Sequence, residues 1–441
     1  MVEHVTGNYR WAIILCRFSD QPQLPQTTQF FKDLFVNPGT GGMFDYWHDV
    51  SYGTIDLTGS KVYDNGGSWY QLPYTLAFDK SRTGPQPVQR WNRINDAINA
   101  VRDSIVIEES NPNALLKYNG IIIILNAQVD SGSFIGPQVP SVPIGTHTGV
   151  KYGLVVLDPG AWTNSWASHE MGHGYGLNHS YNIDTGVYGD GWDIMSAFTF
   201  GGASATFNNR RFGTSGPGLN APGHVFLGWN GNEYASVNLN TLTPGEFKRI
   251  ILAPLNQSVP SGANSFALVS TGDTTYTVEY RNSIGWDQAI TEAVLIHQIR
   301  NDDTGLLLKG THGKEALKAG DEFSGPGFIV SVDTIKEELA TVLIGKPRQV
   351  PPPPVGREQF CKTLTTEIGI DKDNLEKLGH KLQNAATEEE KKEIQNQIEK
   401  LYGEYTLLID EFNDKCRGSG HGSHPQPISL NDFINNDTGD Y

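Results

Sequence analysis

The sequence is poor in cysteine, in positive charge and in long apolar runs. Three of its 441 residues are cysteine, which excludes a scaffold held together by many disulfides. Lysine and arginine number 33 against 49 aspartates and glutamates, and the resulting net charge of −16 argues against nucleic acid as a partner. No apolar run approaches the roughly 20 residues that a membrane-spanning helix needs, so we expect no membrane span.

The remaining composition is that of a globular protein of two or three domains. Hydrophobic residues make up 38% of the chain, enough to build sizeable cores. The first residues, Met1 to His4, lack the basic and apolar stretch of a secretory signal. Cys16 falls in a predicted core strand, whereas Cys361 and Cys416 flank a helical segment and are able to pair. We therefore expect a secreted or extracellular protein, whose signal has been removed or which is exported without one.

One stretch, HEMGHGYGLNH from His169 to His179, concentrates the chemistry. His169 and His173 are four residues apart, which on a helix places both imidazoles on one face. Gly176 favours a helix end because glycine adopts positive φ, and the chain can then return with His179. Three imidazoles predict a zinc site with an open fourth position, which is typical of catalytic zinc. Glu170, turned off the histidine face, is the candidate general base.

This pattern is too specific to be expected by chance. With 12 histidines and 49 glycines in 441 residues, these five residues at these offsets have a chance probability of roughly 10⁻⁴ or below. The alternative is an ordinary helix with exposed histidines, and the low probability disfavours it.

The motif resembles that of the metzincin clan of zinc endopeptidases, whose histidines, glutamate and glycine have the spacing of His169, Glu170, His173, Gly176 and His179. That clan also carries a methionine turn beneath the metal, and Met195 in the run WDIMS fits it. Ser180, after the third histidine, matches several subfamilies. Astacin-like and serralysin-like members place a tyrosine two residues after the methionine. This chain has Ala197 there, so the role of that tyrosine is not carried over. The segment from Tyr46 to Gly53 is more loosely similar to gametolysin-like and immune-inhibitor-A-like peptidases.

The resemblance implies an α+β fold with a zincin-like catalytic domain, a mixed twisted sheet plus an active-site helix, over residues 1–235. It implies a zinc-dependent endopeptidase that hydrolyses peptide bonds of protein or peptide substrates, with Glu170 as general base towards a metal-activated water. In such enzymes the strand before the active-site helix borders the cleft, so Tyr152 to Leu157 is our candidate substrate-binding edge. Tyr181 and Tyr188 are candidate donors to the oxyanion.

Other polar residues near the motif have several interpretations. Asp184, Asp190 and Asp193 precede the methionine turn and fit partners of a zinc histidine, a Ca²⁺ site or a solvated loop, of which we favour the last. Two stretches rich in Gly and Ser, Ser131 to Gly149 and Phe198 to Gly218, predict long loops. We expect four histidines without a partner at ligand spacing to be structural or exposed: His48, His147, His224 and His297.

The second half of the chain has a different pattern. Short strands broken by Gly, Asn and Asp turns predict an antiparallel β-sandwich over residues 236–346, either a packing partner of the catalytic domain or a substrate- or glycan-binding module. Residues 347–357 predict a proline-rich linker, and residues 418–441 a disordered tail. Between them, residues 358–417 predict a C-terminal helical hairpin whose first helix breaks at Gly369.

The ends of this hairpin carry the last two cysteines. If the helices pair in register, Cys361 and Cys416 lie at its open end, and we hypothesise a disulfide there. Closing that loop would contribute on the order of 4 kcal/mol to stability.

Two functions compete with the peptidase. The first is a catalytically weak zinc protein that acts as a binding or adhesion module through its β-sandwich and helical hairpin. Glu170 argues against it, because a protein without turnover needs no base. The second is a zinc amidase acting on a non-peptide substrate, and the long metal motif beside a strand favours peptides instead. The sequence leaves the oligomeric state open.

Overall fold

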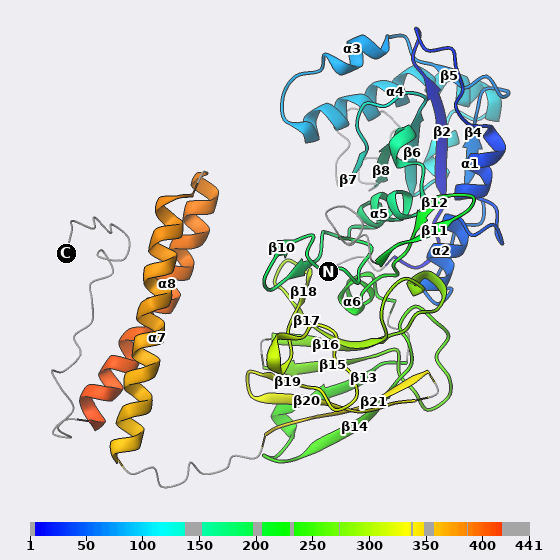
Figure 1. The fold of residues 1–441 in the computed structure, drawn as a ribbon. Coiled ribbons are helices and arrows are strands. Elements are labelled where there is room, and N and C mark those ends of the chain that lie inside the picture. The colour runs from blue at the N-terminus through cyan, green and yellow to red at the C-terminus, as the bar shows by residue number, and fades with distance from the viewer. Residues whose placement is uncertain are drawn as a thin grey trace. The chain divides into compact units, whose positions relative to one another are not determined.

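The computed structural model describes residues 5–136, 152–196, 205–229, 233–272, 274–336, 338–347, 357–385 and 387–416. It is a mixed α+β protein with several sheets and helices (Figure 1), which confirms the predicted class at that level. The chain forms two compact units, residues 1–348 and 349–441. Within the described residues, the helices are too short or too polar to cross a membrane.

A six-stranded sheet forms the core of the N-terminal region, in the order β4-β2-β6-β8-β7 with β5 also pairing to β2. Its strands are β2 (Trp11–Arg17), β4 (Lys61–Tyr63), β5 (Tyr70–Gln71), β6 (Gly120–Leu125), β7 (Gly132–Gly136) and β8 (Tyr152–Leu157). All pairs are parallel except that of β7 with β8. The residues of β6 are buried throughout, as its continuous apolar run predicts for a strand covered on both faces.

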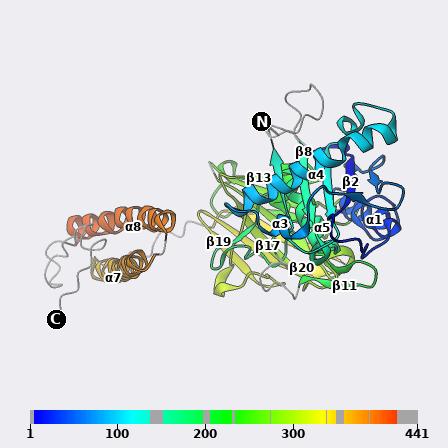
Figure 2. The same cartoon turned by 90° about the horizontal axis from the view of Figure 1, so that it is seen from above.

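Helices cover both faces of this sheet. Alternate residues of β2, β6 and β8 enter two hydrophobic clusters, one shared with α1 (Thr28–Phe35), α2 (Met43–Val50) and α5 (Asn164–Tyr175), the other with α4 (Gln86–Glu109). Seen from above, α4 runs across the strands (Figure 2). The short helix α3 (Leu76–Lys80) precedes α4, and β1 (Gly7–Asn8) pairs with β3 (Ile55–Asp56) outside the sheet.

The position of β7 corrects the predicted substrate-binding edge. Tyr152 to Leu157 form β8 as an inner strand between β6 and β7, and β7 is the outermost strand among the described residues. Gly132–Gly136 lies in a stretch whose composition predicts a loop, and it becomes a strand because β8 offers its free side for pairing. The rest of that predicted loop, residues 137–151, lies outside the described part of the chain.

Two further sheets occupy the rest of the first unit, a seven-stranded one in the order β10-β9-β18-β17-β16-β15-β13 and a four-stranded one in the order β14-β21-β20-β19. They contribute jointly to one hydrophobic cluster, in which Val278 and Ile296 of the larger sheet meet Val330 and Val342 of the smaller. The larger sheet contains β9 (Tyr181–Asn182), β10 (Gly186–Val187), β13 (Ala235–Asn238), β15 (Phe266–Thr271), β16 (Thr274–Arg281), β17 (Ala293–Ile299) and β18 (Gly305–Leu307). The smaller sheet contains β14 (Phe247–Leu252), β19 (Glu322–Gly325), β20 (Phe328–Lys336) and β21 (Leu339–Gly345).

The larger sheet reaches back into the region of the histidine motif. Its strands β9 and β10 follow α5 directly, and β9 pairs in parallel with β18, which lies more than a hundred residues later. In Figure 1, α5 lies on the side of the first sheet that faces β9 and β10. The histidine motif therefore lies where the two sheet regions of this unit meet.

Most of the described residues between Phe198 and Gly218, a stretch predicted as a surface loop, belong to a hairpin or are buried. Its described residues form the hairpin of β11 (Phe207–Asn209) and β12 (Gly213–Ser215), and residues 215–220 are buried ahead of α6 (Ala221–Leu227). The loop prediction is wrong here because buried carboxylates bind the backbone N–H groups of this polar segment. Residues 197–204 lie outside the described chain.

The described residues of the second unit form α7 (Arg357–Gln383) and α8 (Glu388–Lys415), which share one hydrophobic cluster. The predicted break at Gly369 is wrong, because α7 continues through it. A single glycine costs a helix only about 1 kcal/mol, which the neighbouring turns and the packing overcome. Cys416 is buried, but the side chain of Cys361 lies outside the description, so their disulfide stays a prediction. Most of the predicted linker and tail also lies outside it.

Candidate metal centre

Helix α5 delivers the first two histidines as the sequence predicts. The side chain of Thr163 accepts a hydrogen bond from the backbone N–H of Trp166 and so caps the first turn. Gly176 ends the helix in the left-handed region with φ 103°, a conformation that costs glycine little. The chain reverses at this glycine and returns His179 to the exposed side of the helix end.

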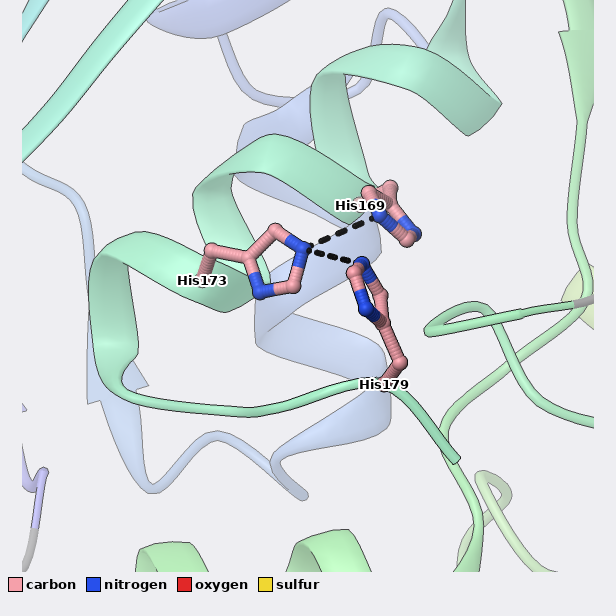
Figure 3. Close-up of side chains that lie close together, drawn as sticks. All are labelled: His169, His173 and His179. Atoms are coloured by element: carbon pink, nitrogen blue, oxygen red, sulfur yellow. Dashed lines mark hydrogen bonds between the residues drawn. The ribbon is translucent and has the colours of Figure 1, made fainter. Parts of the chain in front are cut away.

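The three imidazoles converge on one point (Figure 3). His173 Nε2 lies 3.1 Å from His169 Nε2 and 3.0 Å from His179 Nε2. The three nitrogens all lie within 4.8 Å of one another. Tetrahedral zinc with Zn–N bonds of about 2.0–2.1 Å would set its nitrogens about 3.3 Å apart, close to the observed spacing.

The hydrogen bonds of the other ring nitrogens decide which nitrogens can bind a metal. His169 Nδ1 lies 2.9 Å from the carbonyl oxygen of Ile194, and His173 Nδ1 lies 2.7 Å from that of Leu177. A carbonyl only accepts, so each Nδ1 carries the proton and donates it. Both Nε2 atoms then present lone pairs at 3.1 Å, an arrangement that is favourable when a cation lies between them. The residues therefore fit a divalent metal.

The environment keeps these imidazoles neutral. Burial, reinforced by the neighbouring imidazoles, lowers the pKa of His169 well below its ordinary value and that of His179 to about 3. Burial also lowers the pKa of His173, and the Arg90 cation adds to the effect. A neutral imidazole is the form that binds metal, so the site is prepared for an ion at neutral pH.

The candidate base lies beside the ligands. Glu170 is 5% exposed, His169 is buried, and His173 and His179 are partly exposed, so the cluster has one side open to solvent. The carboxylate of Glu170 interacts electrostatically with the phenol of Tyr188 and the guanidinium of Arg90. The arrangement offers three ligands, a neighbouring carboxylate and access for a substrate.

Met195 packs against the helix that carries the first two candidate ligands. The side chain is 1% exposed, and a Cβ added to Gly172 of α5 would come within 2.5 Å of its sulfur. The preceding residue, Ile194, supplies the carbonyl that orients His169. Ala197, where the family resemblance differs, lies outside the described residues.

The two later aspartates are not solvated, which corrects the favoured interpretation. Asp190 and Asp193 are 0% and 1% exposed. Ser180, next to His179, donates a hydrogen bond of 2.6 Å to Asp193, and His297 Nε2 lies 2.9 Å from Asp190. Burial and the Asp190 charge raise the pKa of Asp193 to about 7. These contacts brace the segment that carries the third ligand.

Asp184 behaves differently, since it is exposed and forms an ion pair with Lys309. The three histidines are the group of possible metal ligands that converges among the described residues. The predicted calcium site therefore receives no support from them.

A set of buried charges on the larger sheet is absent from the predictions. Arg281 of β16 is 0% exposed and binds the carboxylates of Asp287 and Glu279. Glu279 accepts the backbone N–H of Ala221 at 2.6 Å, and Asp287 accepts that of Gly218 at 2.8 Å. The signal in the sequence is the run TTYTVEYR, where two charges interrupt an apolar strand, because charges at buried positions need partners.

The two tyrosines named as oxyanion donors have different surroundings. The ring centroid of Tyr188 lies 4.0 Å from that of His179. Tyr181 instead lies under the guanidinium of Arg300, 4.0 Å from its ring centroid. The structure thus brings Tyr188 into contact with a candidate metal ligand, whereas the ring of Tyr181 contacts Arg300.

A comparison of the chain with protein-family models and with curated proteins finds no match. The functional assignment therefore depends on the geometry of this site.

Proposed function

We propose that this protein is a zinc-dependent endopeptidase. The observation that carries the proposal is the convergence of three Nε2 atoms, two of them held as acceptors by backbone carbonyls, beside the buried carboxylate of Glu170. Three protein ligands leave a position for water or substrate, which distinguishes catalytic from structural zinc.

The residues would divide the chemistry among them. Zinc held by His169, His173 and His179 would lower the pKa of a water to about 7 and polarise the scissile carbonyl. Glu170 would take one proton from the attacking water as the water oxygen bonds to the carbonyl carbon and the C=O electron pair moves onto the carbonyl oxygen. The same carboxyl group then gives the proton to the amine nitrogen as the C–N bond breaks. The products are a carboxylic acid and an amine.

The finer architecture belongs to the same proposal. We assign the first sheet with α5 to a zincin-like catalytic domain, the two later sheets to a β-sandwich, and α7 with α8 to a helical hairpin. The buried charges shared by β16 and residues 218–221 support a packing role for the sandwich.

The extended substrate is assigned to β7 in place of β8. The outer strand among the described residues exposes main-chain N–H and C=O groups on its free side, and a peptide can pair with such an edge. Peptides are therefore favoured as substrates over compact non-peptide amides.

Replacing the base tests this function. Glu170→Gln should retain one zinc per chain and lose at least about 10²-fold in the cleavage of casein or of a peptide library, because the amide cannot accept a proton. Zinc content is measured by atomic absorption and cleavage by mass spectrometry, with and without a chelator. The control is Glu246→Gln, an exposed glutamate on the smaller-sheet side of the unit. A Glu170→Gln protein that cleaves as fast as the parent would refute the mechanism.

A further inference from the structure

The negative charge that develops on the carbonyl oxygen of the substrate needs a hydrogen-bond donor as well as a metal. In acyl transfer, the carbonyl oxygen becomes an oxyanion, and a donor fixed near its final position lowers the barrier. Such a group must lie beside the metal ligands and keep its position without substrate.

Tyr188 meets the first condition. Its ring contacts that of His179, with the centroids 4.0 Å apart and the planes at 42°. Its phenol interacts electrostatically with Glu170 and with Arg90, and the residue is partly exposed. Tyr188 is therefore next to one metal ligand, near the candidate base and accessible to a substrate.

The hairpin that carries Tyr188 meets the second condition. The backbone N–H of Tyr188 donates to the carbonyl of Ser180 at 3.0 Å. Val187 of β10 pairs with Tyr181 of β9, and Tyr181 pairs with Leu306 of β18. The loop is thus closed on the residue after His179 and anchored to the larger sheet.

The backbone of Tyr188 gives a further indication that its position is enforced. Its φ is 62°, in the left-handed region, which is unfavourable for a bulky residue and persists where the surrounding structure imposes it. Tyr188 directly follows β10, and its ring contacts that of His179.

The neighbouring donors are engaged elsewhere. Arg90 holds Asp130 with two hydrogen bonds, of 2.6 and 2.9 Å. Tyr181 is stacked beneath Arg300. Of these three side chains, the ring of Tyr188 is the one whose contact with a candidate ligand, His179, the structure records.

We propose that Tyr188 is a catalytic residue of this site, whose phenol donates a hydrogen bond to the oxyanion that forms when the scissile carbonyl is attacked. The inference rests on the proposed peptidase function. It assigns to the β9–β10 hairpin, and so to the larger sheet that anchors it, a direct part in the reaction.

The test compares Tyr188→Phe with the parent and with Tyr181→Phe from the same hairpin. Tyr188→Phe should lower kcat by about 10²-fold, with KM, zinc content and melting temperature unchanged, because only the transition state loses a hydrogen bond. A phosphinic peptide, which mimics the tetrahedral anion, should bind the variant with a comparable loss of affinity by calorimetry. Tyr181→Phe should match the parent in every measurement.

Two outcomes would overturn the inference. One is a Tyr188→Phe protein with the kcat and phosphinic-peptide affinity of the parent. The other is a loss that is accompanied by loss of zinc or of thermal stability, since that would show a structural role. If the parent itself cleaves no peptide, the peptidase proposal fails, whereas equal cleavage by parent and variant removes only the role of Tyr188.

Discussion

At the residue scale, the site is determined by where two imidazole protons lie. His169 and His173 each donate from Nδ1 to a backbone carbonyl, and this leaves Nε2 of both as an acceptor. The carbonyls belong to Ile194 and Leu177, one in the methionine turn and one in the helix-ending turn. The hydrogen bonds to these backbone carbonyls therefore determine the tautomers of both rings.

The lowered pKa values predict that zinc is retained in mild acid. An unperturbed imidazole gains a proton near pH 6.5, but burial lowers the pKa of all three histidines, that of His179 to about 3. The neutral, metal-binding forms therefore persist as the pH falls below 6.5, and zinc should remain bound at pH 5. Dialysis over a pH series followed by atomic absorption measures this, with circular dichroism to confirm folding. Half-release of zinc near pH 6.5 in folded protein would contradict it.

The sequence predicts the candidate ligands but not the residues that support them. Helix periodicity and a helix-ending glycine determine the relative positions of four residues, and so the sequence predicts their proximity: His169, Glu170, His173 and His179. The sequence does not predict the burial of Asp190 and Asp193. Their hydrogen-bond partners come together only in the tertiary fold, and these are Ser180, Asn220 and His297.

At the scale of elements, two glycines allow α5 to pack closely against the first sheet. Gly153 in β8 faces Gly174 in α5, and a Cβ on Gly153 would lie 2.7 Å from the Gly174 carbonyl oxygen. The obstacle is backbone on a helix, which cannot rotate away. The short distance between α5 and its sheet therefore depends on the absence of a Cβ at both glycines.

Adding one methyl group at this contact should displace the helix. We expect Gly153→Ala to lose about 1–3 kcal/mol of unfolding free energy, as overpacked cores do, and to bind zinc more weakly. Denaturant unfolding and zinc titration measure the two effects. The matched control is Gly191→Ala, where an added Cβ meets open space. Equal stability and zinc affinity of both variants would show that the contact is not limiting.

The sequence predicts elements well where the pattern is local. The apolar run of β6 and the capped helix α5 follow from neighbouring residues. The strand β7 does not, because Gly132–Gly136 has the composition of a loop and is ordered by its pairing with β8. The helix break predicted at Gly369 is wrong in the opposite sense, because packing stabilises α7 as one continuous helix through this residue.

At the scale of the whole molecule, the segments that carry the three candidate ligands contact both sheet regions of the first unit. Strand β9, directly after the third ligand, pairs with β18. The charges of Glu279 and Asp287 bind the backbone of residues 218–221, and His297 pairs with Asp190. Local sequence patterns do not predict contacts between residues that are so far apart in the chain.

Truncation should reveal that zinc binding depends on these contacts. Residues 1–347 should fold, bind one zinc and retain peptidase activity, because they preserve the first compact unit without α7 and α8. Residues 1–235 should bind no zinc with comparable affinity, since β9 loses β18 and Asp190 loses His297. Circular dichroism, zinc content and cleavage of a peptide library measure the difference. A soluble, zinc-bound and active fragment of residues 1–235 would refute the dependence.

Zinc K-edge X-ray absorption on the zinc-loaded parent tests the central claim most directly, because it reports the atoms bound to the metal. We predict three imidazole nitrogens at about 2.0–2.1 Å and one oxygen from water. A sulfur ligand, a fourth protein nitrogen that closes the site, or the absence of stoichiometric zinc would contradict the account.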